Sequence, residues 1–206
     1  MCTRYYIARD DEYLSSIGGI AREHPLYVSM REKLGQPVKT EGEIFPGDIV
    51  PVIAVNKNGE ERVFPMKWGY TFPGGKKLVL NARSESAAGR AMFSEGFLHH
   101  RCVIPASFYY EWESRQEEGG IRKIKHIMKP QAGRLCWMAA IYRIEDGFPR
   151  FTILTKEADE SILYVHDRMP VIFSEEAGRA WIRPDADPAA LLGQAARDVA
   201  VSDAGL

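Results

Sequence analysis

Cys2 has the most distinctive chemistry open to it in this chain, because it directly follows Met1. Methionine aminopeptidase removes an initiator methionine when the next side chain is small, so we expect a mature chain that begins with Cys2. Its α-amine and thiol would then form a 1,2-aminothiol. The amine can condense with an aldehyde, and the thiol can close on the imine carbon to give a thiazolidine. Position alone leaves open that Cys2 is simply the residue after the start.

Two further segments could assist such a nucleophile. If Cys2 begins a strand, the two-residue period places Arg4 on the same face. Asn81 and Arg83 stand where an expected strand meets an expected helix, a junction that exposes side chains and suits an anion. Asn81 could orient a nucleophile, and Arg83 could grip a phosphate or a carboxylate. The alternative is that Asn81 only caps a turn.

A strand expected over 107–113 would place Glu111 among aromatic side chains. Alternation puts Tyr109, Glu111 and Glu113 on one face, and Phe108, Tyr110 and Trp112 on the other. Partial desolvation raises the pKa of a carboxyl group toward values useful for proton transfer. The alternative is an amphipathic strand whose polar side faces water.

His166 begins the segment His166-Asp167-Arg168-Met169-Pro170. Histidine is the side chain best suited to proton transfer near neutral pH, although a histidine near a loop is often only exposed. A metal site could compete for such groups. No CxxC, HxxxH or HExxH spacing occurs, so we expect no metal and no cofactor.

Composition narrows the class of protein. The chain has 206 residues, 45% of them hydrophobic and 27% charged, which is ordinary for a soluble globular protein. No run of 18 apolar residues and no secretory signal is visible, so we expect no membrane association. Three cysteines fit a reducing cytoplasm. The net charge of −1 disfavours a dedicated duplex-DNA binder, but it allows a local basic groove.

The expected elements are mainly strands, with fewer helices. Asn58-Gly59 predicts a hairpin between strands over 50–56 and 61–68. Further strands are expected over 77–80, 101–104, 107–113, 123–129, 135–144, 150–155 and 169–173. Helices are expected over 84–93, 159–165, 174–182 and 188–199. Strands that follow one another directly favour an α+β fold with a mostly antiparallel, curved or barrel-like core and helices outside. We expect a single domain over 1–206, in which 183–206 form a helical tail.

Five motifs in this order resemble one family, the SOS-response-associated peptidase (SRAP) domain, over about 2–182. They are Cys2-Thr3-Arg4, Trp68-Gly69, Asn81-Ala82-Arg83-Ser84-Glu85, Pro105-Ala106 followed by Tyr110-Glu111-Trp112, and His166-Asp167-Arg168-Met169-Pro170-Val171. Three places depart from the family pattern: Thr3, Phe108, and the segment 70–73. Thr3 and Phe108 could narrow the pocket.

The resemblance implies a function. Members of the family process abasic sites and shield damaged single-stranded DNA. Carried to this chain, Cys2 would bond covalently to the aldehyde of an abasic site, with Asn81, Glu111 and His166 as the other catalytic residues. Glu111 would handle Schiff-base protons, and His166 would act in opening the sugar ring.

The same resemblance implies how DNA is held. The DNA-binding residues would be Arg4, Trp68, Arg83, Pro105 and Arg168. The expected partner is single-stranded DNA with abasic sites, bound by a cytoplasmic monomer that joins the nucleoid at damaged DNA. No protein partner is indicated.

Two other functions stay open. An N-terminal cysteine with a histidine and an acid could form a cysteine peptidase that cleaves itself ahead of Cys2. Strand cleavage through an uncaptured Schiff base would add a lyase activity. The non-enzyme alternative is a nucleic-acid-binding module in which Cys2 is incidental.

Overall fold

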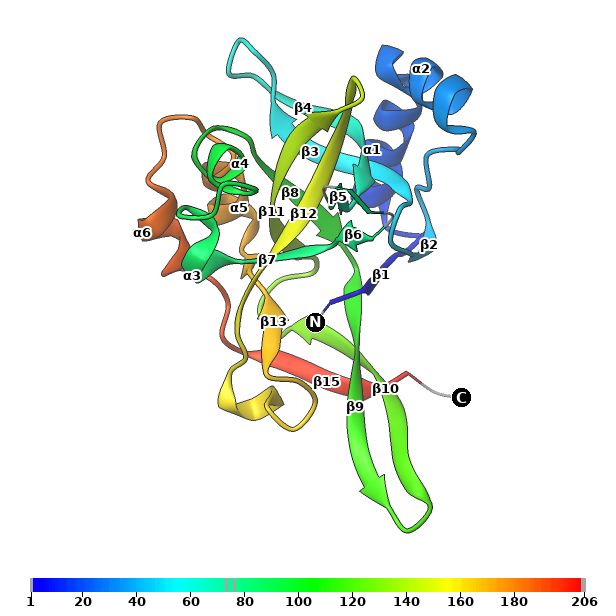
Figure 1. Cartoon of the computed structure of the whole chain (residues 1–206), viewed down its shortest axis with the longest axis vertical. Helices are drawn as coiled ribbons and strands as arrows, with labels where there is room; N and C mark the ends of the chain where they lie inside the picture. The colour runs from blue at the N-terminus through cyan, green and yellow to red at the C-terminus, as the bar shows by residue number, and fades with distance from the viewer. Residues whose placement is uncertain (1, 73, 76, 205–206) are drawn as a thin grey trace.

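The computed structural model describes residues 2–72, 74–75 and 77–204, and it confirms the α+β fold class. Five strands close into a barrel (Figure 1). β12 completes the ring because it pairs antiparallel with β11 and parallel with β4. The barrel strands are β3 (Ile49–Val55), β4 (Glu61–Trp68), β8 (Arg101–Ala106), β11 (Cys136–Glu145) and β12 (Phe148–Glu157).

The predicted hairpin between β3 and β4 is confirmed. Val55 pairs with Glu61 across the turn, and Gly59 adopts a φ of 76°, which glycine reaches without strain. The side chain of Asn56 accepts hydrogen bonds from the backbone N–H groups of Asn58 and Glu60. Local turn chemistry therefore sets the register of these two barrel strands.

Short strands extend the barrel at its rim. β7 runs parallel to β12, and β13 pairs antiparallel with the far end of β12, so both lie along one barrel strand. The other short strands either lie at the rim or form a separate two-stranded sheet. The short strands are β5 (Tyr70–Thr71), β6 (Leu78–Val79), β7 (Asn81–Arg83), β13 (Arg168–Pro170) and β14 (Ile172–Phe173).

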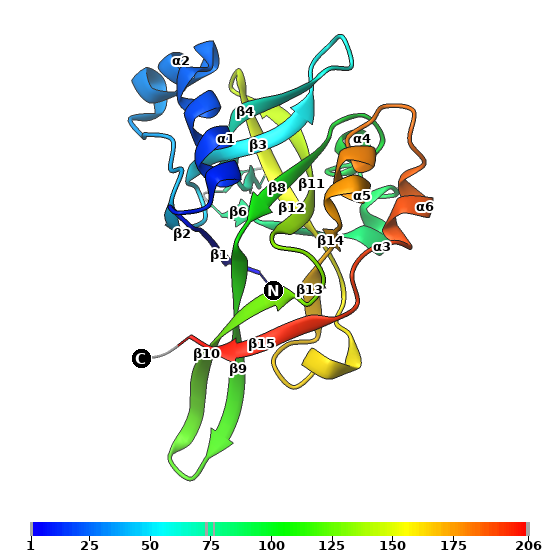
Figure 2. The ribbon, with the colours of Figure 1, turned by 180° about the vertical axis from the view of Figure 1, so that it is seen from behind.

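A second sheet has the order β15-β10-β9-β1-β2. Its long β9–β10 hairpin extends away from the barrel as an arm (Figures 1 and 2). The chain passes from β8 into β9 through the single residue Ser107. Its backbone N–H donates to Tyr6 O, and its hydroxyl accepts from Ala8 N at 2.9 Å. The sheet's strands are β1 (Arg4–Ile7), β2 (Gly42–Ile44), β9 (Phe108–Glu117), β10 (Gly120–Pro130) and β15 (Val199–Asp203).

Two helices near the N-terminus were not predicted. Asp11 caps α1 (Glu12–Glu23) by accepting from Leu14 N, and α2 (Pro25–Leu34) begins at a proline, a favoured first helical residue. The apolar spacing in α1 was the overlooked signal. The predicted helix over 84–93 is instead α3 (Ser84–Ala87), followed by turns and then α4 (Ser94–His99). The other helices are η1 (Glu160–Ile162), α5 (Glu175–Trp181) and α6 (Pro188–Leu192).

The predicted terminal helix over 188–199 is wrong beyond Leu192. The chain turns after α6 and forms β15, which pairs antiparallel with β10 from His126 to Pro130. Val199 is buried there, and the alternating Val-Ala-Val sequence fits a strand that covers one sheet edge. Within the described part of the chain, no helix is long and apolar enough to cross a membrane.

Candidate functional site

Cys2 lies just ahead of β1 and is fully buried. Its thiol donates to the carbonyl oxygen of Arg4 across 3.6 Å. Burial raises the pKa of the Cys2 thiol well above its ordinary value, and the nearby Glu111 carboxylate raises this pKa further. The thiol is therefore protonated at neutral pH. Met1, whose removal the aminothiol chemistry requires, lies outside the described residues.

Asn81 joins Cys2 to the barrel. It is the first residue of β7, which pairs with β12, and its Nδ2 donates to the carbonyl oxygen of Cys2 at 2.9 Å. The contact is to the backbone carbonyl rather than to the thiol. Asn81 Oδ1 is also buried, and it has no hydrogen-bond partner among the described residues. The site therefore forms where the second sheet meets the barrel.

Glu111 comes to Cys2 from β9. Its side chain is only 4% exposed, and Oε1 accepts from the backbone N–H of Trp112 at 3.3 Å. The predicted alternation is confirmed, because the aromatic rings contact one another along the opposite face: Phe108 packs edge-on against Tyr110, which contacts Trp112. Cys2, Asn81 and Glu111 are thus brought together from three strands or strand ends.

Arg4 does not share the side of Cys2, contrary to the prediction. β1 begins only at Arg4, so the two-residue period does not extend back to Cys2. Arg4 pairs with Tyr110, and its guanidinium lies over the rings of Phe45 and Trp112 on the outer face of the sheet. Phe108 stacks on Tyr6 on this outer face as well, so it does not narrow the space around Glu111.

His166 lies on the segment between η1 and β13, and it is partly exposed. Its Nδ1 accepts from the backbone N–H of Arg168 at 3.0 Å, which leaves the proton of the neutral ring on Nε2. Asp167 Oδ1 lies 2.7 Å from the same Nδ1 and would be the partner of a charged ring. In the described residues no hydrogen bond joins His166 to Cys2, Asn81 or Glu111.

A hollow of about 260 Å³ opens beside Asn81. Two exposed arginines, Arg83 and Arg90, line it together with Phe93 and Thr155. Arg90 also donates to the hydroxyl of Ser86 at 3.3 Å. Two cations and one aromatic ring next to the residue that holds Cys2 are suited to an anionic ligand.

Trp68 and Pro105 are both buried, and their part in DNA binding stays a prediction. Trp68 is fully enclosed, its Nε1 donates to Leu80 O at 3.2 Å, and its ring stacks on Phe151. Pro105 sits inside β8 opposite Trp137. Both side chains belong to the barrel core. Burial of this kind is usual for tryptophan, which is largely buried in most folded proteins.

Arg168 is likewise buried, and its guanidinium is already engaged. It forms a two-point ion pair with Glu85 at 2.8 and 2.9 Å and donates to Thr155 O at 2.7 Å. The pair ties β13 to α3 and β12. In this structure Arg168 holds the His166 segment against the barrel, and its direct contact with DNA stays a prediction.

His126 is a buried polar group that sequence reasoning did not connect with the site. It pairs with Glu111 across β9 and β10. Its Nε2 lies 3.0 Å from Glu113 Oε2, and its Nδ1 lies 3.2 Å from Asp203 Oδ1. Hydrogen bonds from Arg115 and then from His126 lower the pKa of Glu113. No motif marks His126, because only strand pairing brings it beside Glu111.

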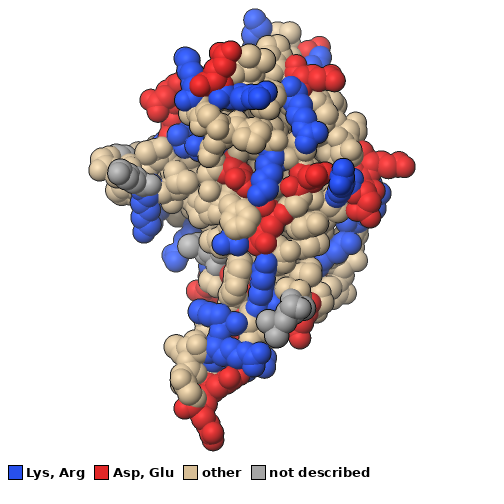
Figure 3. Space-filling view, turned by 90° about the vertical axis from the view of Figure 1, so that its right-hand side faces the viewer, with Lys and Arg blue, Asp and Glu red and all other residues tan. Residues whose placement is uncertain are grey.

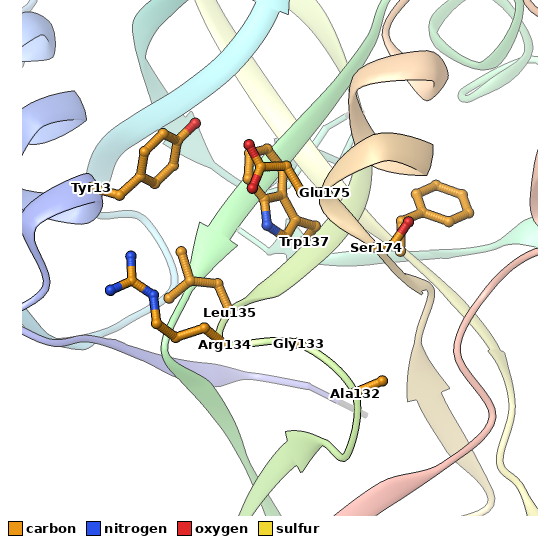
Figure 4. A pocket seen from close by; sticks show the side chains of 9 residues that line it. Tyr13, Ala132, Gly133, Arg134, Leu135, Trp137, Ser174 and Glu175 are labelled. Atoms are coloured by element: carbon orange, nitrogen blue, oxygen red, sulfur yellow. The ribbon is translucent and has the colours of Figure 1, made fainter.

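Other surface features differ from this site. The pocket in Figure 4, of about 280 Å³, lies between α1, the segment before β11 and the start of α5, where Tyr13, Trp137 and Glu175 face it. None of its lining residues is a predicted site residue. On the side of the molecule shown in Figure 3, basic side chains gather in the lower part near the arm, and basic and acidic side chains are mixed over the rest, so no single broad basic face covers this side.

The fold and the site together define an α+β protein with a closed barrel, a second sheet, and a buried cysteine held between an amide and a carboxylate. A family model described as SOS response associated peptidase (SRAP) matches residues 1–203. The chain belongs to this family. The match extends beyond the range 2–182 expected from the motifs and includes β15.

Named relatives agree with this assignment, and solved structures share the fold. Abasic site processing protein YoqW of Bacillus subtilis is 29% identical over 164 residues, 72% of this chain and 72% of YoqW. Abasic site processing protein YedK of Escherichia coli is 33% identical over 144 residues, 67% of this chain and 60% of YedK. A crystal structure of a Bacteroides thetaiotaomicron protein superposes with a TM-score of 0.70 at 18% identity, over 98% of this chain and 93% of that one, and shows the shared fold.

Proposed function

We propose that this protein processes abasic sites in single-stranded DNA by bonding covalently to them through Cys2. The observation that carries the proposal is the meeting of Cys2, Asn81 and Glu111 where the two sheets join. Membership of the SRAP family and the printed names of its relatives supply the substrate class.

The reaction balances as a condensation. After removal of Met1, the α-amine of Cys2 adds to the aldehyde carbon of the ring-opened sugar, and the carbinolamine loses water to give an imine. The sulfur then adds to the same carbon, and the thiol proton passes to the nitrogen. One aldehyde and one aminothiol yield a thiazolidine and one water.

The state of the thiol sets the order of these steps. Because the pKa of the Cys2 thiol is raised by burial, the sulfur is a weak nucleophile before the amine has reacted. A free α-amine has a pKa of about 8, so on the order of a tenth of it is neutral at pH 7. The amine attacks first, and Glu111 removes the thiol proton as the ring closes.

Asn81 and His166 take the remaining roles. Asn81 fixes the backbone of Cys2, and its Oδ1 is an acceptor that the free amine can use. His166, whose neutral ring carries its proton on Nε2, is suited to donate that proton to the sugar oxygen during ring opening. Arg83 and Arg90 hold phosphates beside the hollow.

The test is a denaturing gel of the protein mixed with a single-stranded oligonucleotide that carries one abasic site. Mass spectrometry first establishes that Met1 is absent. We expect a shifted band that Cys2→Ala abolishes and that prior treatment of the DNA with hydroxylamine prevents. A processed chain that gives no shifted band would refute the proposal.

The peptidase alternative has less support. A cysteine peptidase needs a thiolate activated by a histidine. Here the pKa of the thiol is raised, and in the described part of the chain no histidine hydrogen-bonds to it. A version extended ahead of Cys2 distinguishes the two functions: self-removal of the extension that Cys2→Ala abolishes would favour the peptidase.

A further inference from the structure

Three charged side chains meet on the outer face of the second sheet. Glu43 Oε1 accepts from Arg4 Nη1 at 3.0 Å and from Lys125 Nζ at 3.0 Å. The register explains the meeting, because β2, β1, β9 and β10 are neighbours and their paired residues point to one side. Two cations from separate strands thus share one carboxylate oxygen.

Aromatic rings surround this ion cluster. The Arg4 guanidinium lies 4.0 Å from the ring centroid of Phe45, and Lys125 Nζ lies 3.6 Å from that of Tyr110. Both cations also lie 5.8 Å from the ring of Trp112. Phe45 is 38% exposed, but its ring carries Lys39 Nζ at 4.6 Å from the centroid as well as Arg4. Trp112 is partly exposed, so its flat apolar surface borders the cations. Such surfaces stack on unpaired bases.

The cluster is accessible and charged. The side chains of Arg4, Glu43 and Lys125 are 34%, 27% and 33% exposed. Although burial opposes it, hydrogen bonds from Lys125 and Arg4 leave the pKa of Glu43 below its ordinary value. The carboxylate is therefore ionised at neutral pH, and it satisfies cations that would otherwise face solvent.

We propose that Arg4 and Lys125 form a binding subsite for a backbone phosphate of single-stranded DNA, and that Glu43 fills this subsite in the free protein and is displaced when DNA binds. The inference rests on the proposed function, and it adds Lys125 and Glu43 to the binding surface. A carboxylate and a phosphate present similar oxygens to the same donors.

The occupant follows from the mixture of groups. A phosphate alone would need only the two cations, whereas Trp112 adds flat surface for the adjoining base. Single-stranded DNA offers both a phosphate and an unpaired base, and a duplex keeps its bases stacked inside. Because Glu43 competes with the phosphate for the two cations, it would keep the affinity for undamaged DNA low. The covalent step would then select the lesion.

The experiment measures binding of an undamaged single-stranded oligonucleotide by fluorescence anisotropy over a range of salt concentrations. Undamaged DNA has no aldehyde, so the Cys2 chemistry does not contribute. Glu43→Gln should bind about fivefold more tightly at low salt, the scale of one exposed ion pair. Its logarithmic salt dependence should match that of the wild type, because both proteins make the same phosphate contact once DNA is bound.

A matched control separates this effect from general charge. Glu41→Gln removes the same charge from an exposed pair with Arg9 on the neighbouring segment, and it should change affinity far less. Lys125→Gln, alone and combined with Glu43→Gln, completes a double-mutant cycle in which the gain should disappear. Melting curves confirm that each variant is folded.

Each outcome decides the matter. Equal affinities for Glu43→Gln and Glu41→Gln would overturn the subsite, and so would a gain in affinity that persists without Lys125. In either case, crosslinking by the wild type would leave the proposed function standing. A wild type that neither binds nor crosslinks single-stranded DNA overturns both. An equal gain for a polyglutamate peptide would assign the cluster to acidic polypeptides and overturn the DNA subsite.

Discussion

Replacing Glu111 with glutamine separates two effects of this carboxylate. Glutamine keeps the size of the side chain and removes its charge. Because Glu111 is only 4% exposed, bulk water cannot easily replace it in its proposed function as a base. General acid–base catalysis contributes roughly 10²- to 10⁴-fold. We therefore predict that Glu111→Gln slows crosslinking to an abasic oligonucleotide by about 100-fold, the lower end of that range.

The same change should make the thiol easier to ionise. Glu111 is, after burial, the largest contributor that raises the pKa of the Cys2 thiol, so removing its charge lowers this pKa. More thiolate would then be present at a given pH. The two effects have opposite signs on the rate of ring closure. A slower reaction with a more acidic thiol would identify Glu111 as a proton carrier.

Both quantities can be measured on one preparation. Crosslinking is followed under single-turnover conditions on denaturing gels, and thiol ionisation is followed by the pH dependence of alkylation of Cys2, with the peptide identified by mass spectrometry. Glu113→Gln is the matched control, since Glu113 lies on the same face of β9 but is held by Arg115 and His126. It should change the crosslinking rate by less than about threefold, well below the factor for a direct proton carrier. A Glu111→Gln rate equal to the wild type, or one that rises with the thiolate fraction, would refute the reasoning.

Four other predictions follow from burial and contacts. Trp68→Ala should lower the free energy of unfolding by about 3–5 kcal/mol, because the ring is fully enclosed. Trp112→Ala should instead weaken binding of single-stranded DNA by about 1–3 kcal/mol per lost stack. Denaturant titration measures the loss of stability and fluorescence anisotropy the loss of binding, and the reverse pattern for the two variants would contradict the structure. Asn81→Ala, which removes the hydrogen bond to Cys2 O, should slow crosslinking about tenfold on the same gels, and a wild-type rate would remove its positioning role. Burial raises the pKa of the Cys102 thiol, so above the ordinary thiol value of about 8.5 the unfolded chain loses this proton and the folded chain keeps it. Stability measured by urea titration should therefore fall with rising pH, and Cys102→Ala should flatten that slope by about 1.4 kcal/mol per pH unit; an unchanged slope would contradict the assignment.

Local patterns predicted the strands well where turn chemistry or alternation was strong. Asn58-Gly59 marked the β3–β4 hairpin, and the alternation along β9 placed Glu111 opposite the aromatic face. The same alternation failed for Cys2 and Arg4, because the strand begins at Arg4 and the period does not apply before it. Residue spacing predicts which side chains share a face only within one strand or helix. The prediction therefore holds only between the two ends of that element.

Long-range contacts explain the remaining differences. The hydrogen bond from Asn81 to Cys2 joins residues 79 positions apart, and His126 reaches Glu111 only through strand pairing. Trp68 and Arg168 have side chains that suit DNA equally well, yet the fold uses one as core and the other as a buried ion pair with Glu85. Residue type gives the chemistry that is available, and burial decides which part of it faces a ligand.

The placement of Cys2 gives a physical reason for selectivity. An exposed thiolate would react with many electrophiles and oxidants, whereas a buried thiol whose pKa is raised reacts with few of them. If the amine must react first, only a carbonyl compound that reaches the junction of the two sheets can begin the sequence. The imine then brings its carbon next to the sulfur, and the effective concentration of an oriented neighbour compensates for a poor nucleophile. Under the proposed function, burial of Cys2 slows simple thiol chemistry and would thereby reserve this residue for aldehydes such as an opened abasic site.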